Sequence, residues 1–118
     1  PNSEYVSEAL ELMDELQNKL EKKDFEISKQ YYTIRDYASA IKSLDNFIAD
    51  NPGTIFREEA LYYKWLSQYE IAINSIESRI VERVTELERS LGNFLRYYPD
   101  TIFIEDLSEK INIAKQLL

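Results

Sequence analysis

The chain has 118 residues, 44% hydrophobic and 31% charged, with two Gly and three Pro; this composition predicts a folded, mostly helical domain and excludes a disordered chain. The absence of Cys excludes disulfides, and the absence of His removes the usual general base and the commonest metal ligand. The net charge of −8 argues against nucleic-acid binding, which needs Lys or Arg clustered on one face.

The first predicted element is a helix over residues 3–34, which is far longer than the average helix of a globular domain. It contains no Gly or Pro, and its apolar residues recur at helical spacing. These residues are Val6, Leu10, Met13, Leu16, Leu20, Ile27, Tyr31 and Ile34. Asp24 interrupts the apolar face, so we expect the helix to bridge two packing environments.

The same helix carries most of the acidity of the chain. Residues 1–26 contain eight acidic residues and three Lys, which gives 3 − 8 = −5. A solvated helix face explains these charges with the fewest assumptions, and a basic partner is the alternative.

The next elements are two helices separated by a proline turn. Following Arg35 and Asp36, apolar spacing predicts a helix over 37–50, and Pro52 cannot continue it. A third helix is predicted over 54–77, with Thr54 as its N-cap.

The last two predicted helices follow the same plan. A fourth helix is expected over 80–97 and stops before Pro99. Thr101 then repeats the capping role of Thr54 and begins a fifth helix over 101–117.

A duplicated block gives the fold class. Residues 43–58 (SLDNFIADNPGTIFRE) recur 47 residues later as residues 90–105 (SLGNFLRYYPDTIFIE), with nine of the sixteen positions identical. A repeated helix end, proline turn and helix start is typical of stacked helical repeats, in which neighbouring units bury each other's apolar faces. We therefore predict an all-α, tetratricopeptide-like superhelix of about five helices, forming a single domain over residues 1–118.

Individual positions support this repeat class. With Pro52 as the terminal proline of the repeat, four residues occupy its spaced aromatic, alanine and aliphatic positions: Tyr31, Ala40, Leu44 and Phe47. The period of 47 exceeds the usual 34 by 13 residues, so we expect an insertion over residues 69–82.

Several segments resemble the carboxy-terminal part of the BamD family. They are residues 22–37 (KKDFEISKQYYTIRDY), residues 51–54 (NPGT), residues 57–61 (REEAL) and residues 12–20 (LMDELQNKL), the last being similar to a long helix that joins the halves of that family's repeat array. The BamD family comprises lipoproteins of the machinery that inserts β-barrels into the bacterial outer membrane.

The resemblance implies properties that the residues themselves do not show. It implies that the sequence is an excerpt of a longer repeat array, with more repeats before Pro1 and a signal and lipid-bearing Cys upstream. It also implies a periplasmic location at the outer membrane and docking to periplasmic domains of the barrel-forming subunit. Membrane contact would come only through the lipid anchor.

The aromatic residues divide into expected core and candidate surface positions. Periodicity favours a core role for Phe25, Tyr31, Phe47, Trp65 and Phe94. By contrast, Tyr32, Tyr62, Tyr97 and Tyr98 lie beside these stripes, so some of them should reach a surface. Exposed Tyr is enriched in interface hot spots, which makes these four residues and the neighbouring Arg96 candidates for partner binding.

The amino-terminal half of the first helix is the other candidate interface. Its apolar face, with Val6, Leu10 and Met13 as the leading candidates, extends beyond the helix that would pair with residues 37–50. We expect this face to pack against preceding repeats in a longer protein, and against a second copy when the chain is isolated.

No catalytic, cofactor or metal site is predicted. The acidic pairs Glu58–Glu59 and Glu105–Asp106 are adjacent on helices, so the two carboxylates of each pair point apart, and their place in a first helical turn explains them. We therefore expect a non-enzymatic protein-interaction scaffold without small-molecule substrate. The alternative is a cytoplasmic tetratricopeptide adaptor for peptide tails, for which Lys29, Arg35 and Lys42 are the nearby cations.

Overall fold

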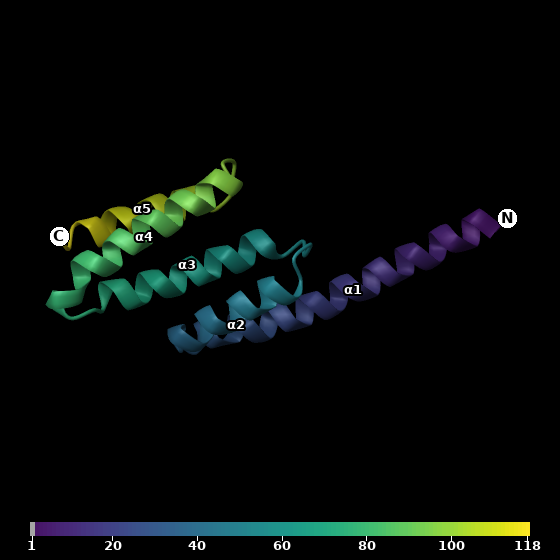
Figure 1. Cartoon of the computed structure of the whole chain (residues 1–118), viewed down its shortest axis with the longest axis horizontal. Helices are drawn as coiled ribbons and strands as arrows, with labels where there is room; N and C mark the ends of the chain where they lie inside the picture. The colour runs from purple at the N-terminus through teal and green to yellow at the C-terminus, as the bar shows by residue number, and fades with distance from the viewer. Residues whose placement is uncertain (1) are drawn as a thin grey trace.

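The computed structural model describes residues 2–118, and within them it contains five helices and no strand. The helices are α1 (Asn2–Thr33), α2 (Tyr37–Asp50), α3 (Arg57–Ile73), α4 (Glu77–Tyr97) and α5 (Ile104–Lys115). Successive helices run antiparallel, and the amino-terminal half of α1 projects alone from the stack (Figure 1). The result is an all-α, tetratricopeptide-like array with extents of 66 × 28 × 19 Å.

The turn between α1 and α2 has a regular hydrogen-bonding pattern with one unusual residue. The Arg35 N–H donates to the carbonyl of Tyr32 at 3.0 Å, and the Asp36 N–H donates to that of Tyr31 at 2.9 Å. This is a Schellman motif, whose left-handed position is usually Gly but is here Arg35, with φ of 65°. Asp36 then caps α2 by accepting a hydrogen bond from the Ser39 N–H at 3.2 Å.

Thr54 and Thr101 are not the N-caps that the sequence predicted. The helices α3 and α5 begin three residues later, at Arg57 and Ile104. Each Thr hydroxyl instead accepts the N–H two residues on, that of Phe56 or Phe103, at 3.2 Å. A buried Thr therefore closes a short turn of its own in front of the helix, and the two turns are built alike.

The extra length between the repeats lies in helix rather than in a loop. The predicted helix over 54–77 ends at Ile73, and α4 begins at Glu77 instead of residue 80, so only three residues connect them. Two side chains of the connection cap the last turn of α3. The Asn74 amide donates to the Glu70 carbonyl at 2.8 Å, and the Ser75 hydroxyl donates to the Ile71 carbonyl at 2.6 Å. The helix α4 has 21 residues where α2 has 14.

Two apolar cores hold the array together. The smaller joins α1, α2 and α3 through Phe25, Leu44, Phe47 and Ala60. The larger joins α3, α4 and α5; its buried members are Trp65, Leu66, Tyr69, Ala72, Val84, Leu87, Leu91, Phe94, Leu107, Ile111 and Ala114. Tyr63 is half-buried against both cores.

A hydrogen bond from Trp65 links α3 to α4, the two longest helices of the larger core. Its indole Nε1–H donates to the main-chain carbonyl of Leu87, 3.0 Å away on α4. The ring itself is 1% exposed, so its polar N–H needs this partner.

Four of the five predicted core aromatics are buried, and Tyr31 is not. The packing face of α1 consists of Glu21, Phe25 and Ser28, and the Ser28 hydroxyl forms a 2.7 Å hydrogen bond with Ser43 of α2. Tyr31 lies outside this face. The apolar spacing that included Tyr31 follows a different side of the helix.

Candidate protein-docking surfaces

Exposed apolar side chains follow the outer face of α1 and the turn after it on both sides of Asp24, and we call this set the α1 stripe. It contains Val6, Leu10, Met13, Leu16, Leu20, Ile27, Tyr31 and Ile34, each at least 37% exposed. The amino-terminal half was expected to lack a cover within this chain. The carboxy-terminal half is also bare, because α2 and α3 pack against the Phe25 side of the helix.

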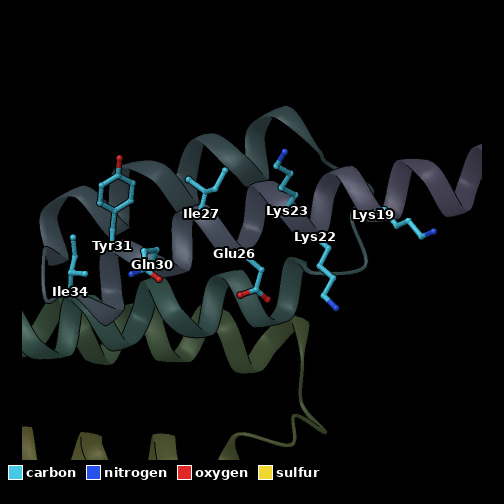
Figure 2. Close-up of a pocket in the computed structure, with 8 residues that line it drawn as sticks. All are labelled: Lys19, Lys22, Lys23, Glu26, Ile27, Gln30, Tyr31 and Ile34. Atoms are coloured by element: carbon cyan, nitrogen blue, oxygen red, sulfur yellow. The ribbon is translucent and has the colours of Figure 1, made fainter.

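A shallow hollow of about 740 Å³ lies along the second half of the stripe. Its lining side chains come from α1 and the turn residue that follows it, as Figure 2 shows: Lys19, Lys22, Lys23, Glu26, Ile27, Gln30, Tyr31 and Ile34. Three Lys therefore border an apolar strip. A partner that packs on Ile27 and Tyr31 would meet positive charge at one end of the hollow.

The net charge of α1 changes from negative to neutral along the stripe, since residues 19–26 hold three Lys and three acidic residues. Between residues 3 and 18 the helix carries five carboxylates, Glu4, Glu8, Glu11, Asp14 and Glu15, and no Lys or Arg. The Lys residues of the hollow follow directly. Electrostatic complementarity sets the orientation of a bound partner more than its affinity, so the uneven charge favours one direction for a helix lying along α1.

A second surface forms where α3 begins and α4 ends. The Arg57 guanidinium donates to the Tyr98 hydroxyl at 3.1 Å and lies 5.3 Å from the centre of the Tyr97 ring. Arg57 is half-buried, whereas Tyr97 is 67% exposed. We call these three residues the Arg57 cluster. It borders a groove of about 180 Å³ between α3 and α4.

The Arg57 cluster joins predicted residues to one that sequence reasoning missed. Tyr97 and Tyr98 were candidates, and the neighbouring Arg96 is exposed on the last turn of α4. Arg57 was overlooked because it lies inside the duplicated block. The signal was present, since the second copy has Ile104 at the same place.

Tyr62 is committed to internal contacts rather than to a free surface. Its ring stacks on Phe103 with centroids 3.9 Å apart, and its hydroxyl donates to Asp106. Burial raises the pKa of Tyr62 above its ordinary value, and the hydrogen bond to Asp106 raises it further. Burial would raise the pKa of Asp106 too, but hydrogen bonds from Lys110 and Tyr62 outweigh it and lower that pKa.

Tyr32 is likewise half-buried. Its ring meets that of Tyr63 edge-on, with centroids 5.3 Å apart, and that of Tyr37 at 5.8 Å. Burial raises the pKa of Tyr32. The structure therefore leaves Arg96, Tyr97, Val6, Leu10 and Met13 as the exposed members of the candidate set, with Tyr98 partly accessible.

The acidic pairs lie in helical first turns, as their spacing indicated. Glu58 and Glu59 open α3, and Glu105 and Asp106 open α5. Glu58 accepts a 3.4 Å hydrogen bond from Thr101. Within residues 2–118 no three acidic side chains are grouped closely enough to hold a metal ion.

Comparison with known families decides where this array belongs. A family model described as "YfiO: Outer membrane lipoprotein" matches residues 26–118. The chain belongs to this family. No curated protein matches the chain.

Membership in the YfiO family points to the cell envelope and to protein partners there. Of the helices over residues 2–118, none combines the length and the apolar character that crossing a membrane requires. The match begins at Glu26 and so includes the Arg57 cluster and the end of the α1 stripe, but leaves out the projecting half of α1.

Proposed function

We propose that this chain is a non-catalytic scaffold that holds protein subunits of the machinery inserting β-barrel proteins into the outer membrane, as BamD does. The observation that carries the proposal is the match of residues 26–118 to a family of outer membrane lipoproteins. Three of the four segments that resemble the BamD family, residues 22–37, 51–54 and 57–61, lie almost wholly within that match, and the fourth, residues 12–20, lies outside it. The proposed location is the periplasmic face of the outer membrane, with a lipid anchor outside the present sequence.

The two exposed surfaces fit such a scaffold. The α1 stripe offers apolar contact area along a rigid helix. The Arg57 cluster offers an exposed Tyr beside a guanidinium whose position is fixed by a hydrogen bond and by ring contacts. Tyr and Arg are the residues most enriched in interface hot spots, so we propose the cluster as the contact that discriminates between partners.

Affinity capture from the envelope of the source cell tests the function. The tagged protein, produced with its natural upstream residues, should recover a β-barrel assembly subunit of the outer membrane. Recovery of soluble cytoplasmic proteins alone would contradict the proposal and revive the peptide-tail adaptor, which the family match does not support.

Variants locate the contact once the partner is captured. The double variant Arg57→Gln with Tyr97→Ala should lower recovery roughly tenfold, which corresponds to about 1.4 kcal/mol. Arg89→Gln is the matched control, because Arg89 is an exposed cation that forms an ion pair with Glu86 on its own helix. If both variants recover equal amounts of the partner, the Arg57 cluster is not part of the interface. That result would not contradict the proposed scaffold function.

A further inference from the structure

Arg57 is a half-buried cation without an acidic partner. Within residues 2–118 no carboxylate oxygen lies within 4.0 Å of its guanidinium, although the chain has 22 acidic residues. Its contacts are with neutral groups, the hydroxyl of Tyr98 at 3.1 Å and the rings of Tyr97 and Tyr98, whose centres are 5.3 and 6.0 Å away. A charge that is partly removed from water is stabilised by an opposite charge, so the guanidinium is available to an anionic group.

The groove between α3 and α4 that Arg57 borders, which we call the Arg57 groove, has the size of a single side chain. Its volume is about 180 Å³, whereas sites for small molecules usually hold about 300 to 1,000 Å³. Leu61 and Phe94 give it apolar walls, and the Asn93 amide adds a polar group. An amino-acid side chain with an apolar stem and a charged end matches this lining.

The hydrogen-bonding groups at the Arg57 groove favour a carboxylate. The other cation of the lining, Lys64, already pairs with Asp45 at 2.7 Å. The Tyr98 hydroxyl accepts a hydrogen bond from Arg57 and retains its own hydrogen for donation. A carboxylate beside Arg57 can therefore accept hydrogen bonds from the guanidinium and from the hydroxyl, and such charge-assisted bonds are the strong ones.

The lining indicates a side-chain carboxylate rather than the carboxyl terminus of a peptide. Terminal carboxylates are captured by free main-chain N–H groups. The residues that line the Arg57 groove all lie within α3 and α4, where helical hydrogen bonds occupy these groups. Even at the start of α3 the Arg57 N–H donates to the Thr54 carbonyl, at 3.4 Å.

Exposed isoleucines accompany this site on the two proline turns. Ile55 and Ile102 occupy the same place in the two copies of the duplicated block and are 69% and 85% exposed. The turns are close together, because the Thr101 hydroxyl of the second turn donates to Glu58, on the first helical turn after the first, at 3.4 Å. The surface that flanks the Arg57 groove is therefore apolar.

We propose that the Arg57 groove receives a glutamate side chain that projects from an apolar patch of a folded partner protein. Arg57 and Tyr98 bind the carboxylate, and the apolar patch rests on Ile55 and Ile102. The inference rests on the proposed scaffold function and adds the chemistry of the contact. The net charge of −8 repels a surface with many carboxylates, so the partner presents a single one here.

A titration tests the carboxylate site without the partner. The probe is N-acetyl-L-glutamic acid α-amide, whose only carboxylate is in the side chain, and the ¹⁵N-labelled 118-residue chain is followed by NMR at constant ionic strength. The Arg57 Nε–H and Asn93 amide signals should shift, with a Kd on the order of millimolar for one charged contact. The matching glutamine compound is the control and should shift neither signal.

Variants assign the binding to the proposed groups. Arg57→Gln should weaken binding of the glutamate probe at least about fivefold, and Arg89→Gln should leave it unchanged. Tyr98→Phe retains the ring and should weaken binding about threefold, which keeps the test informative if Arg57→Gln fails to fold. Equal shifts with the glutamine compound would overturn the proposal, as would unchanged binding in the Tyr98→Phe variant. Tighter binding of N-acetylglycine, a terminal carboxylate, would overturn the choice of a side chain.

The apolar part of the contact is tested on the captured partner. The double variant Ile55→Ser with Ile102→Ser should lower recovery roughly fivefold and leave the glutamate titration unchanged. Ile76→Ser is the matched control, because Ile76 is also 69% exposed but lies between α3 and α4. Equal recovery by the double variant and the control would overturn this part. Because the titration needs no partner, it can fail while capture succeeds, and failed capture alone contradicts only the proposed function.

Discussion

At the scale of single residues, Asp106 forms a polar link between α3 and α5. It lies on the first turn of α5, accepts a hydrogen bond from Tyr62 of α3, and pairs with Lys110 at 2.6 Å. Its lowered pKa means that the ionised carboxylate stabilises the folded chain. This contribution is complete above the ordinary Asp pKa of about 3.9 and is lost as the pH falls through the lower folded-state pKa.

We therefore predict that Asp106→Asn destabilises the protein near neutral pH and has little effect in strong acid. The expected loss is about 1 kcal/mol at pH 7, since the group is half-buried and its partners are partly screened by water. Urea unfolding followed by circular dichroism at pH 7 and below the folded-state pKa measures the difference.

Asp100→Asn provides the comparison for this prediction, because Asp100 is an exposed carboxylate on the turn after Pro99. That variant should unfold like the parent chain at both pH values. An equal cost of Asp106→Asn at neutral and acid pH would mean that packing of the side chain, rather than its charge, carries the effect.

Arg57 shows what a residue-level comparison of repeats can reveal. Most of the duplicated block maintains the turn, so the identical positions say little about partners. Seven of the sixteen positions differ, and at one of them, where Arg57 stands in place of Ile104, the side chain meets Tyr97 and Tyr98 in space. The Arg57 side chain reaches from the start of α3 to the end of α4. The spacing of residues along the chain does not predict this contact.

At the scale of elements, the end of α1 depends on one left-handed residue. Arg35 has φ of 65°, a conformation that costs an L-residue roughly 1–2 kcal/mol and Gly almost nothing. The same residue donates the hydrogen bond to Tyr32 that closes the helix.

Arg35→Gly is predicted to leave the free energy of unfolding unchanged or to raise it by up to about 1 kcal/mol, because relief of strain exceeds the added entropy of the unfolded chain. Arg35→Val should lower it by at least about 1 kcal/mol, since a β-branched side chain clashes in this region. Chemical denaturation of the two variants compares them directly. A Gly variant less stable than the Val variant would contradict the argument from the left-handed backbone at Arg35.

The helix α1 also marks the limit of prediction from the sequence. Helical periodicity identified all five helices, the turn at Arg35–Asp36 and most core aromatics, because those features depend on local spacing. The periodicity predicted the wrong face of α1 as the packing face, because two faces have helical spacing. They are the α1 stripe and the narrower face of Phe25, Ser28 and Tyr32. Only the arrival of α2 and α3 against Phe25 distinguishes them, and that contact joins residues far apart in the chain.

At the scale of the whole molecule, the projecting half of α1 adds length without adding to either core. We predict that deleting residues 1–18 changes the free energy of unfolding by less than about 0.5 kcal/mol, because residues 3–17 are exposed. The measurement is urea denaturation of the 118-residue chain and the shortened chain.

Deleting residues 104–118 is the contrasting variant. It removes Leu107, Ile111 and Ala114 from the larger core, and the expected loss exceeds about 3 kcal/mol. A loss above about 1 kcal/mol on removing residues 1–18 would mean that the projecting half of α1 folds back on the array in solution.

Tyr63 is packed against both cores, and it also contacts Tyr62 and Tyr32 edge-on. The two cores therefore meet at this ring and along α3, which contributes Ala60 to the smaller core and Trp65 to the larger. Trp65, two residues along the same helix, is the only tryptophan of the chain and is buried in the larger core. The fluorescence of Trp65 can therefore report on partner binding. A partner that binds α1 and shifts it against the smaller core should change the emission of Trp65 in the larger core.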